Sequence, residues 1–407
     1  MRRLKSLTAK LGHSVSGSDA STTGHRKENI DGADLVVFSG AIKPNNEELA
    51  FARQCSIPCV ERSEYLGAIA DGYDRVVAIA GSHGKTTATA MTAKVASELK
   101  PTVHIGADYD YLKDEEKSLF ITEACEYRKS LLFLRPTIGV VLNSDLDHTD
   151  CYKSVDEIAQ VFGEFASLSQ TVLYNGDDER LKRVMPPCSL SFGLKADNDF
   201  SAFEIERTSD ERYRFELIFK GKSLGKIETS VKGIHNLYNA LVSASVGVLL
   251  GVPFSKIQEN IRAFTGVKRR NEIVGEINGA QVISDYAHHP TEIKATLSAI
   301  TAKNRVIAVF EPHTYSRTRD LFDGFISSFS RADEVLLLPV YASRESEDKV
   351  NSITLTSEIK KRQKASYFSS YDELSSYLRE TVRSGDTVVF LGAGTIDKCA
   401  RELVNKC

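Results

Sequence analysis

The amino-acid sequence predicts an α/β protein of several domains built on largely parallel sheets. Short apolar runs such as "RVVAIAG" and "DTVVFLGAG" alternate with helical patterns, which is the order of elements in a parallel sheet with crossover helices. One such run enters a glycine-containing loop, "GSHGKTT", and then a helical pattern, as in phosphate-binding α/β domains. The chain has 407 residues, which is long enough for two or three domains.

Composition excludes several classes of protein. The formal net charge of −3 argues against a basic nucleic-acid binder and against an acidic solvating tail. The seven cysteines form no Cys-x-x-Cys pair, which argues against a disulfide framework or a zinc knuckle. No apolar run approaches membrane-spanning length, and the N-terminus lacks the apolar core of a signal peptide. We therefore expect a cytoplasmic protein with no nucleic-acid partner and no membrane insertion.

Three blocks of pattern predict three domains, over residues 1–73, 74–268 and 269–407. The first block has a helical start, "LKSLTAKL", then short apolar strands, and then helix, strand and helix in "AFARQCSIPCVERSEYLGAIA". The middle block alternates strands and helices until 189–232, where "RYRFELIF" alternates with period two and predicts an antiparallel portion. A buried helix follows, which Gly251 is suited to end. The last block opens with a hairpin that turns at Asn278-Gly279 and continues as a second parallel sheet.

The loop "GSHGKTT" predicts a phosphate site. A glycine loop between a strand and a helix N-terminus gathers backbone amides, and the helix dipole favours negative charge there. Gly81 and Gly84 allow close approach of phosphate, Lys85 can reach the terminal phosphates, and the Thr86 hydroxyl can ligate magnesium. The usual phosphate-loop pattern is G-x-x-x-x-G-K-[ST], and Ile79 stands where its first glycine would be. This chain therefore has only a shorter form, which begins at Gly81. A chance strand-turn-helix is the weaker alternative, because every element occurs in the required order.

Acidic residues and a histidine follow two further predicted strands. Glu123 lies in "ITEACE", and Asp145, Asp147 and His148 lie in "VVLNSDLDHTD". Both strands should end at the sheet edge that carries the phosphate loop. Carboxylate and imidazole there could hold metal ions between nucleotide and substrate. The alternatives are a solvated strand end for Glu123 and a helix cap for His148.

Seven segments resemble the Mur ligase family and occur in its order. They are "GSHGKTT", "TEACEY", "NSDLDHTD", "GIHNLYNAL", "SDYAHHPTEIKATL", "EPHTYSRTRDLFDGF" and "GAGTIDK". The resemblance extends from Asp34 to the end. It is strongest to the branch that joins L-alanine to UDP-N-acetylmuramate in peptidoglycan synthesis, because of the histidine in the phosphate loop and the His-His-Pro-Thr-Glu segment. It implies a UDP-binding α/β domain, a central ATPase and a C-terminal Rossmann-like domain that docks on closure.

The resemblance also implies a two-step reaction. A substrate carboxylate attacks the γ-phosphate of ATP to give an acyl phosphate, and the amine of L-alanine then displaces phosphate. Such a reaction requires charge neutralisation and exact placement of two anions. The implied cofactors are ATP and two Mg²⁺ ions.

Roles in the central domain follow from the same resemblance. Thr86 and Glu123 would ligate one magnesium ion, and His148 the second, beside the substrate carboxylate. His235 and Asn236 match a pair near the adenine, although a helix N-terminus capped by asparagine is an equal alternative. The residues that would cradle ATP are Gly81, Ser82, His83, Gly84, Lys85, Thr86 and Thr87.

Two loops of the last domain are implied to line the active cleft. Pro290 suits a first helical position and Glu292 a first turn, so Asp285, Tyr286 and His288 should precede a helix. His288 would contact the nucleotide or the intermediate, whereas His289 fits a surface histidine in a capping loop.

The second loop contains His313 and Arg317, of which Arg317 would hold the alanine carboxylate. Arg270, next to Arg269 at the entry to this domain, would reach the nucleotide phosphates on closure. A charged linker is the alternative for these two arginines.

The first block departs from the family pattern. No strand with a glycine-rich loop precedes its first helix, so we expect a truncated N-terminal UDP-binding domain and poor binding of UDP-N-acetylmuramate. Ser18 and Asp19 would still contact the uridine side.

Two other functions compete with the L-alanine ligase. One is a recycling ligase that joins a tripeptide to the same UDP-sugar, and comparing the two amino substrates would separate them. The other is a non-catalytic ATP-binding relic, against which Lys85, Glu123, His148 and His288 all argue.

Overall fold

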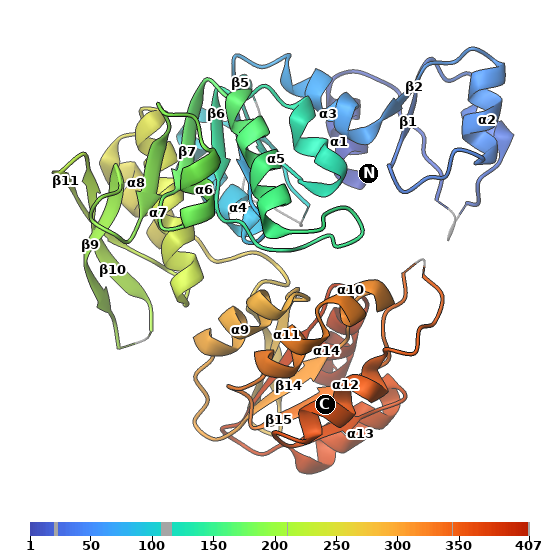
Figure 1. The fold of residues 1–407 in the computed structure, drawn as a ribbon, viewed down its shortest axis with the longest axis vertical. Coiled ribbons are helices and arrows are strands. Elements are labelled where there is room, and N and C mark those ends of the chain that lie inside the picture. Colours follow the sequence, from blue (N-terminus) through green and yellow to red (C-terminus); the bar gives the residue numbers. More distant parts are fainter. Residues whose placement is uncertain (20–22, 107–115, 210, 344, 406–407) are drawn as a thin grey trace.

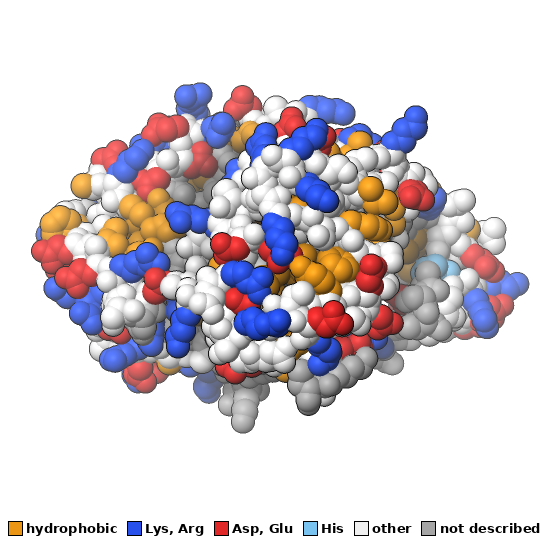
Figure 2. All heavy atoms as spheres, turned by 90° about the horizontal axis from the view of Figure 1, so that it is seen from below, with side chains coloured by type: hydrophobic (Ala, Val, Ile, Leu, Met, Phe, Trp, Pro, Cys, Tyr) orange, Lys and Arg blue, Asp and Glu red, His pale blue; other side chains and the backbone are white. Residues whose placement is uncertain are grey.

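The structure, a computed structural model, describes residues 1–19, 23–106, 116–209, 211–343 and 345–405. Figure 1 shows three parts in chain order, with the C-terminal part facing the central one. Figure 2 shows acidic and basic side chains interspersed over one face, in keeping with the net charge of −3. Within the described ranges, no helix combines the length and apolar character needed to cross a membrane.

The first part contains the predicted first helix and the helix–strand–helix unit, but among its described residues only one strand precedes that unit, where short strands were predicted. Strands β1 (Val36–Phe38) and β2 (Cys59–Glu61) pair in parallel. Leu4 and Leu66, from the first and third helices, are buried in one core with Phe120 of the central sheet. Two helices of this part therefore pack on the central domain. The helical elements are α1 (Arg2–Lys10), η1 (Lys27–Ile30), α2 (Glu47–Gln54) and α3 (Arg62–Ala70).

The central sheet has nine strands in the order β11-β10-β9-β8-β7-β6-β3-β5-β4. The strands from β4 to β9 are parallel, and β10 and β11 are added antiparallel, so the predicted change of pattern is confirmed. Their bounds are β3 (Arg75–Ala80), β4 (Pro101–His104), β5 (Glu116–Glu123), β6 (Ile138–Val141), β7 (Thr171–Asn175), β8 (Leu190–Gly193), β9 (Phe200–Arg207), β10 (Tyr213–Phe219) and β11 (Lys222–Glu228).

Helices cover both faces of this sheet. On one face, α4 (Lys85–Val95), α7 (Ile234–Leu249) and α8 (Phe254–Arg262) bury Met91, Leu241 and Ile257 against β3. On the other face, α5 (Val155–Ser167) buries Phe162. Gly251, at φ 79, follows the end of α7 as predicted. The shorter helices are η2 (Ser97–Leu99), η3 (Tyr127–Phe133) and α6 (Glu179–Val184).

The C-terminal sheet has six strands in the order β12-β13-β17-β14-β15-β16. Only β12 is antiparallel to its neighbour, and the hairpin turns at Asn278 (φ 51) and Gly279 (φ 75) as predicted. The strands are β12 (Glu272–Ile277), β13 (Ala280–Asp285), β14 (Val306–Phe310), β15 (Glu334–Leu337), β16 (Ala365–Tyr367) and β17 (Thr387–Leu391). The helices are α9 (Pro290–Ala299), α10 (Tyr315–Asp320), α11 (Phe322–Ser328), α12 (Ser352–Lys360), α13 (Tyr371–Thr381) and α14 (Ile396–Asn405).

The segment that joins the two large sheets has an unusual backbone. Arg269 and Asn271 have φ values of 60 and 50, in the left-handed region that residues other than glycine rarely adopt. The C-terminal part holds this segment, because the Arg269 guanidinium donates to the carbonyls of Gly392 (3.2 Å) and Gly394 (3.1 Å). The segment therefore belongs physically to the C-terminal part.

Candidate active site between the central and C-terminal sheets

The loop between β3 and α4 requires both of its glycines. Gly81 has φ 137 and Gly84 has φ 82, values that favour glycine. A Cβ atom at Gly81 would also lie 2.9 Å from the Cβ atom of Leu142. The loop thus approaches the next strand as closely as backbone allows, and its amides converge at the start of α4.

The loop after β6 holds the phosphate loop in place. The Ser82 hydroxyl donates to the Asp145 carbonyl and accepts from the Asp145 amide, both at 2.9 Å. The Asn143 side chain accepts from the His83 amide (2.9 Å) and donates to the His83 carbonyl (3.0 Å). The conformation of the phosphate loop therefore depends on residues far along the chain.

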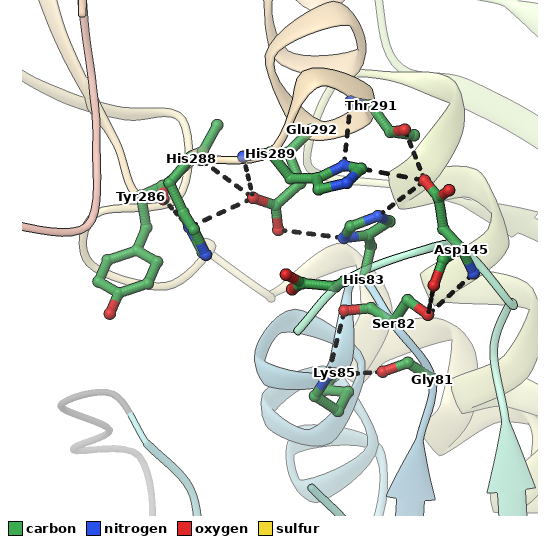
Figure 3. A network of polar contacts seen from close by, with 12 residues as sticks. Gly81, Ser82, His83, Lys85, Asp145, Tyr286, His288, His289, Thr291 and Glu292 are labelled. Atoms are coloured by element: carbon green, nitrogen blue, oxygen red, sulfur yellow. Dashed lines mark hydrogen bonds and ion pairs between the residues drawn. The ribbon is translucent and has the colours of Figure 1, made fainter. Parts of the chain in front are cut away.

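Lys85 is folded back into its own loop. Its Nζ atom donates to the carbonyls of Gly81 (2.5 Å) and Ser82 (3.1 Å) (Figure 3). It also lies 2.8 Å from Oε2 of Glu126. Burial opposes the charge, but the Glu126 carboxylate outweighs it and raises the pKa of Lys85 above its ordinary value. Lys85 is a permanent cation at this place.

Glu126, Asp147 and His148 form a cluster beside Lys85. Their ligand atoms lie within 4.8 Å of one another, and His148 Nε2 is 3.4 Å from Glu126 Oε1. Burial opposes ionisation of Glu126, but Lys85 and then His148 lower the pKa of its carboxyl below the ordinary value. His148 has φ 54, a strained backbone of the kind that occurs at functional sites. The carboxylates are ionised and could hold a cation.

Sequence reasoning missed Glu126 and favoured Glu123. Glu123 ends β5, and its Oε1 atom accepts from the Gly106 amide at 3.1 Å. The chain turns after β5 and brings the second glutamate of "ITEACE" under Lys85. The sequence shows Glu126 as a second candidate ligand in this segment, but it does not show that Glu126 is buried beside Lys85.

The predicted start of α9 is confirmed, with Pro290 as its first residue and Glu292 in its first turn. Contrary to the prediction, His289 does not lie at the surface. It is only 3% exposed, caps the helix by accepting from the Thr291 amide, and donates from Nε2 to the Leu146 carbonyl at 2.9 Å. The expectation failed because α9 docks on the central part, which covers its N-terminus.

Side-chain contacts of Thr291 and Glu292 join α9 to the phosphate-loop region (Figure 3). The Thr291 hydroxyl donates to Asp145 Oδ2 at 2.6 Å. His83 lies between two carboxylates, with Nε2 3.0 Å from Asp145 Oδ2 and Nδ1 3.5 Å from Glu292 Oε1. Burial disfavours the charged ring, but Asp145 and Glu292 outweigh it and raise the pKa of His83 to about 9.

The C-terminal part reaches the cluster of Glu126, Asp147 and His148 through three side chains, those of His288, His313 and Arg317. Arg317 Nη2 lies 2.9 Å from Asp147 Oδ1, and its Nη1 atom lies 3.2 Å from His313 Nδ1. The rings of His288 and His313 have centroids 5.9 Å apart. Burial is the main reason that the pKa of each histidine falls to about 4. Both rings are neutral at pH 7.

A cavity of about 1080 Å³ opens beside the phosphate loop. Gly84, Thr87, His235, Asn236 and Arg270 contribute to its wall, so predicted residues of both large domains meet there. Burial lowers the pKa of His235 to about 4, which keeps the ring neutral. A cavity of this size accommodates a nucleotide.

Helix α7 does not begin with an asparagine cap. Its N-cap is Gly233, and Asn236 lies in the first turn, where its side chain donates to the Lys232 carbonyl at 2.7 Å. The capping alternative for Asn236 is therefore wrong. Thr86, by contrast, lies as expected in the first turn of α4, directly after Lys85.

Arg270 and Asp285 both contribute to the wall of the cavity. Arg270 Nη1 is 3.8 Å from Glu292 Oε1, and its guanidinium lies 5.0 Å from the centre of the Tyr286 ring. Asp285 is buried, and its two oxygens accept from the amides of Asn271 (2.6 Å) and Ala287 (2.7 Å). Burial raises the pKa of Asp285 to about 6. Asp285 thus holds the loops that present Arg270 and Tyr286.

Ser18 and Asp19 lie in the first part, beside α2. The Ser18 hydroxyl donates to Glu48 Oε2 at 2.8 Å, and the Asp19 carbonyl accepts from the Thr23 amide at 3.0 Å. As far as the described residues show, neither contributes to the wall of the cavity. They belong to a separate region of the molecule.

Comparisons with known proteins cover the whole chain. Residues 1–74 match the model of the Mur ligase family catalytic domain, residues 79–247 that of the Mur ligase middle domain, and residues 269–394 that of the Mur ligase glutamate ligase domain. The chain is 36% identical to a UDP-N-acetylmuramate–L-alanine ligase of Alkaliphilus metalliredigens, over 99% of this chain and 94% of that protein. It is 38% identical to the protein of that name from Caldanaerobacter subterraneus, over 97% of this chain and 93% of the other.

Solved structures share the fold. A UDP-N-acetylmuramate–alanine ligase of Thermotoga maritima superposes with a TM-score of 0.80 at 23% identity, over 98% of this chain and 90% of that one. A murein peptide ligase of Psychrobacter arcticus superposes with a TM-score of 0.71 at 21% identity, over 100% of this chain and 96% of that one. At these identities the likeness concerns the fold alone.

Proposed function

Because the chain belongs to the Mur ligase family, we propose that it joins L-alanine to UDP-N-acetylmuramate in an ATP-dependent step of peptidoglycan precursor synthesis. The observation that carries the choice is identity of 36–38% over nearly the whole chain to ligases of that name. The tripeptide-joining alternative has support from fold likeness to solved structures at 21–22% identity. The presence of Lys85, His148 and Arg317 around one cluster favours an enzyme over a binding relic.

ATP would lie with its phosphates on residues 81–87 and its base in the cavity near His235 and Asn236. The amides at the start of α4 suit the phosphates, and the neutral ring of His235 suits a neutral base. Arg270 lies at the wall of the same cavity and could reach a phosphate by leaving Glu292. Thr87 lines the cavity in the first turn of α4.

Lys85 would exchange partners during binding. In the structure it neutralises Glu126 and fills the loop by bonding two carbonyls. A triphosphate offers it a higher negative charge at the same place. When Lys85 turns to the phosphates, the Glu126 carboxylate becomes available to a cation, so one movement prepares two charge contacts.

The residues around this point fit magnesium. Glu126 and Asp147 present ionised carboxylates, the ligand type that magnesium prefers, and the Thr86 hydroxyl follows Lys85 on α4. Glu123 and His148 complete the set that would hold two ions. Magnesium would supply neutralisation of charge on the transferring phosphoryl group.

The C-terminal loops would handle the amino substrate. Arg317 is held by Asp147 and could pass to the carboxylate of L-alanine, for which its planar guanidinium is well suited. His288 and His313 are neutral, so either could accept a proton from the attacking amine. Tyr286 and Asp285 would position this side of the cleft, and Ser18 and Asp19 would contact the uridine.

We also place the protein in the cytoplasm. Both ATP and a UDP-sugar are available there, and the six described cysteines are free thiols, as a reducing compartment requires.

Phosphate release by the purified chain tests the function. We expect release that requires ATP, magnesium, UDP-N-acetylmuramate and L-alanine together, with a product heavier by one alanyl residue in mass spectrometry. Release that requires the tripeptide instead of L-alanine would establish the recycling ligase. ATP binding without any substrate-dependent release would establish the relic.

A further inference from the structure

A second cluster of ligand-type side chains lies apart from Glu126, Asp147 and His148. It consists of His83, Asp145 and His289, whose ligand atoms also lie within 4.8 Å of one another. His83 Nε2 is 3.0 Å and His289 Nδ1 is 3.8 Å from Asp145 Oδ2. The two rings have centroids 4.6 Å apart. A tetrahedral zinc site with bonds of about 2.1 Å separates its ligand atoms by about 3.4 Å, between these two distances.

The far side of each ring has the partner that a metal-binding histidine needs. His289 Nε2 lies 2.9 Å from the Leu146 carbonyl, which can only accept, so this nitrogen carries the proton and Nδ1 carries a lone pair. This lone pair accepts from the Thr291 amide at 3.3 Å, and Nδ1 lies 3.8 Å from Asp145 Oδ2. His83 Nδ1 lies 3.5 Å from the Glu292 carboxylate, which favours a proton on that nitrogen. Carbonyl and carboxylate are the usual second partners of metal-bound histidines.

A cation between His83 Nε2, His289 Nδ1 and Asp145 Oδ2 would be electrostatically favourable. With both far nitrogens protonated, His83 Nε2 and His289 Nδ1 would direct two lone pairs at a carboxylate. The proton that His83 shares with Asp145 relieves one of these repulsions. Thr291 reduces the other, because its amide donates to His289 Nδ1 (3.3 Å) and its hydroxyl donates to Asp145 Oδ2 (2.6 Å). A divalent ion would relieve both and displace the proton. Asp145 and Glu292 supply the negative charge that offsets the positive end of α9.

We propose that His83, Asp145 and His289 form a binding site for a transition-metal ion of the zinc type. The site differs from the magnesium site, because two of its three ligands are imidazole nitrogens, which suit zinc, whereas magnesium prefers oxygen ligands. His83 and Asp145 belong to the central part and His289 to the C-terminal part, so a bound ion ties the two parts in the docked arrangement. Zinc at this site therefore inhibits any cycle that requires the parts to separate.

Zinc titration of the purified chain in excess magnesium tests the site. We expect one Zn²⁺ to bind by calorimetry, and Co²⁺ at the same site to give the strong visible absorption of a four-coordinate ion. The test variant is His289→Asn, because asparagine is a good helix cap and preserves the start of α9. The matched variant is His148→Gln, which removes the histidine of the other cluster.

Loss of a residue that only supports a metal ligand weakens metal binding by about 10–100-fold. His289→Asn removes a ligand itself, so it should weaken zinc binding by more than this. His148→Gln should leave the affinity within about threefold. Zinc should also raise the melting temperature of the unaltered chain but not that of His289→Asn.

Equal affinity in His289→Asn and the unaltered chain would overturn the proposal, as would loss of binding in His148→Gln alone. Asp145→Asn serves as a second variant should His289→Asn fail to fold, and it should weaken binding to a similar degree. No binding of Co²⁺ or Zn²⁺ by the unaltered chain would also exclude the site. None of these measurements uses substrate, so the result is independent of the ligase activity.

Discussion

Arg317 of the C-terminal part lies 2.9 Å from the Asp147 carboxylate of the central part, and both side chains are largely buried. Burial opposes ionisation of Asp147, but Arg317 lowers the pKa of this carboxyl well below its usual range. The pair joins the amino-substrate side of the cleft to the cluster that would hold magnesium. An arginine held in this way is oriented before a substrate carboxylate arrives.

Replacing Arg317 with lysine should raise the KM for L-alanine by about 10–100-fold, because lysine cannot make the paired contacts of a guanidinium. Steady-state phosphate release with varied L-alanine measures this. Arg319→Lys is the matched control, since Arg319 is half-exposed on the same helix and pairs with Asp320 and Asp348. An equal rise in both variants would contradict the assignment.

Replacing Lys85 should abolish turnover, with a fall of at least about 100-fold, because its charge meets the transferring phosphoryl group. Lys85→Ala leaves the buried Glu126 carboxylate without its main partner and should also destabilise the fold by about 3 kcal/mol. The double variant Lys85→Met with Glu126→Gln should recover stability without activity. Thermal melts and phosphate release separate the two effects, and substantial activity in either variant would refute the role of the loop.

If His148 holds the ion beside the substrate carboxylate, as we propose, His148→Ala should reduce kcat by about 10–100-fold and change ATP affinity much less. Nucleotide affinity by calorimetry and single-turnover rates give the two quantities separately. A parallel loss of both would make His148 a nucleotide-side or structural residue.

Glu123→Gln and Glu126→Gln form a matched pair. Each removes one charge and keeps the shape of the side chain. If Glu126 is a main magnesium ligand, its variant should need the higher magnesium concentration for half-maximal activity, by about 10-fold or more. The reverse order would return the main role to Glu123, as the sequence suggested.

His83 should make stability depend on pH. Its pKa in the folded chain is raised to about 9, so its protonated form contributes stability that is present below about pH 6.5 and lost as pH rises through 9. The full contribution is about 3 kcal/mol. Denaturant midpoints between pH 6.5 and 9.5 should fall more steeply for the unaltered chain than for His83→Gln. Equal slopes would show that His83 does not hold this proton.

The amino-acid sequence by itself determined the local features of this protein. The glycines around Ser82 and His83, Lys85 after them, and the strand before them predict a phosphate loop wherever they occur together. The turn at Asn278-Gly279 and the helix that begins at Pro290 likewise follow from conformational preferences of single residues. Each of these features is predicted from neighbours in the chain, although the distant residues Asn143 and Asp145 hold the phosphate loop in its conformation.

Tertiary structure decided which side chains meet. Glu123 and Glu126 are equivalent in the sequence, and only the turn after β5 places Glu126 against Lys85. The sequence predicts a surface histidine at position 289, but α9 docks on the central part and buries His289 against the Leu146 carbonyl. The contact of His83 with Glu292 likewise joins two domains. Such contacts depend on how two separately folded sheets face each other, and the periodicity of one segment contains no information about the segment that will lie opposite.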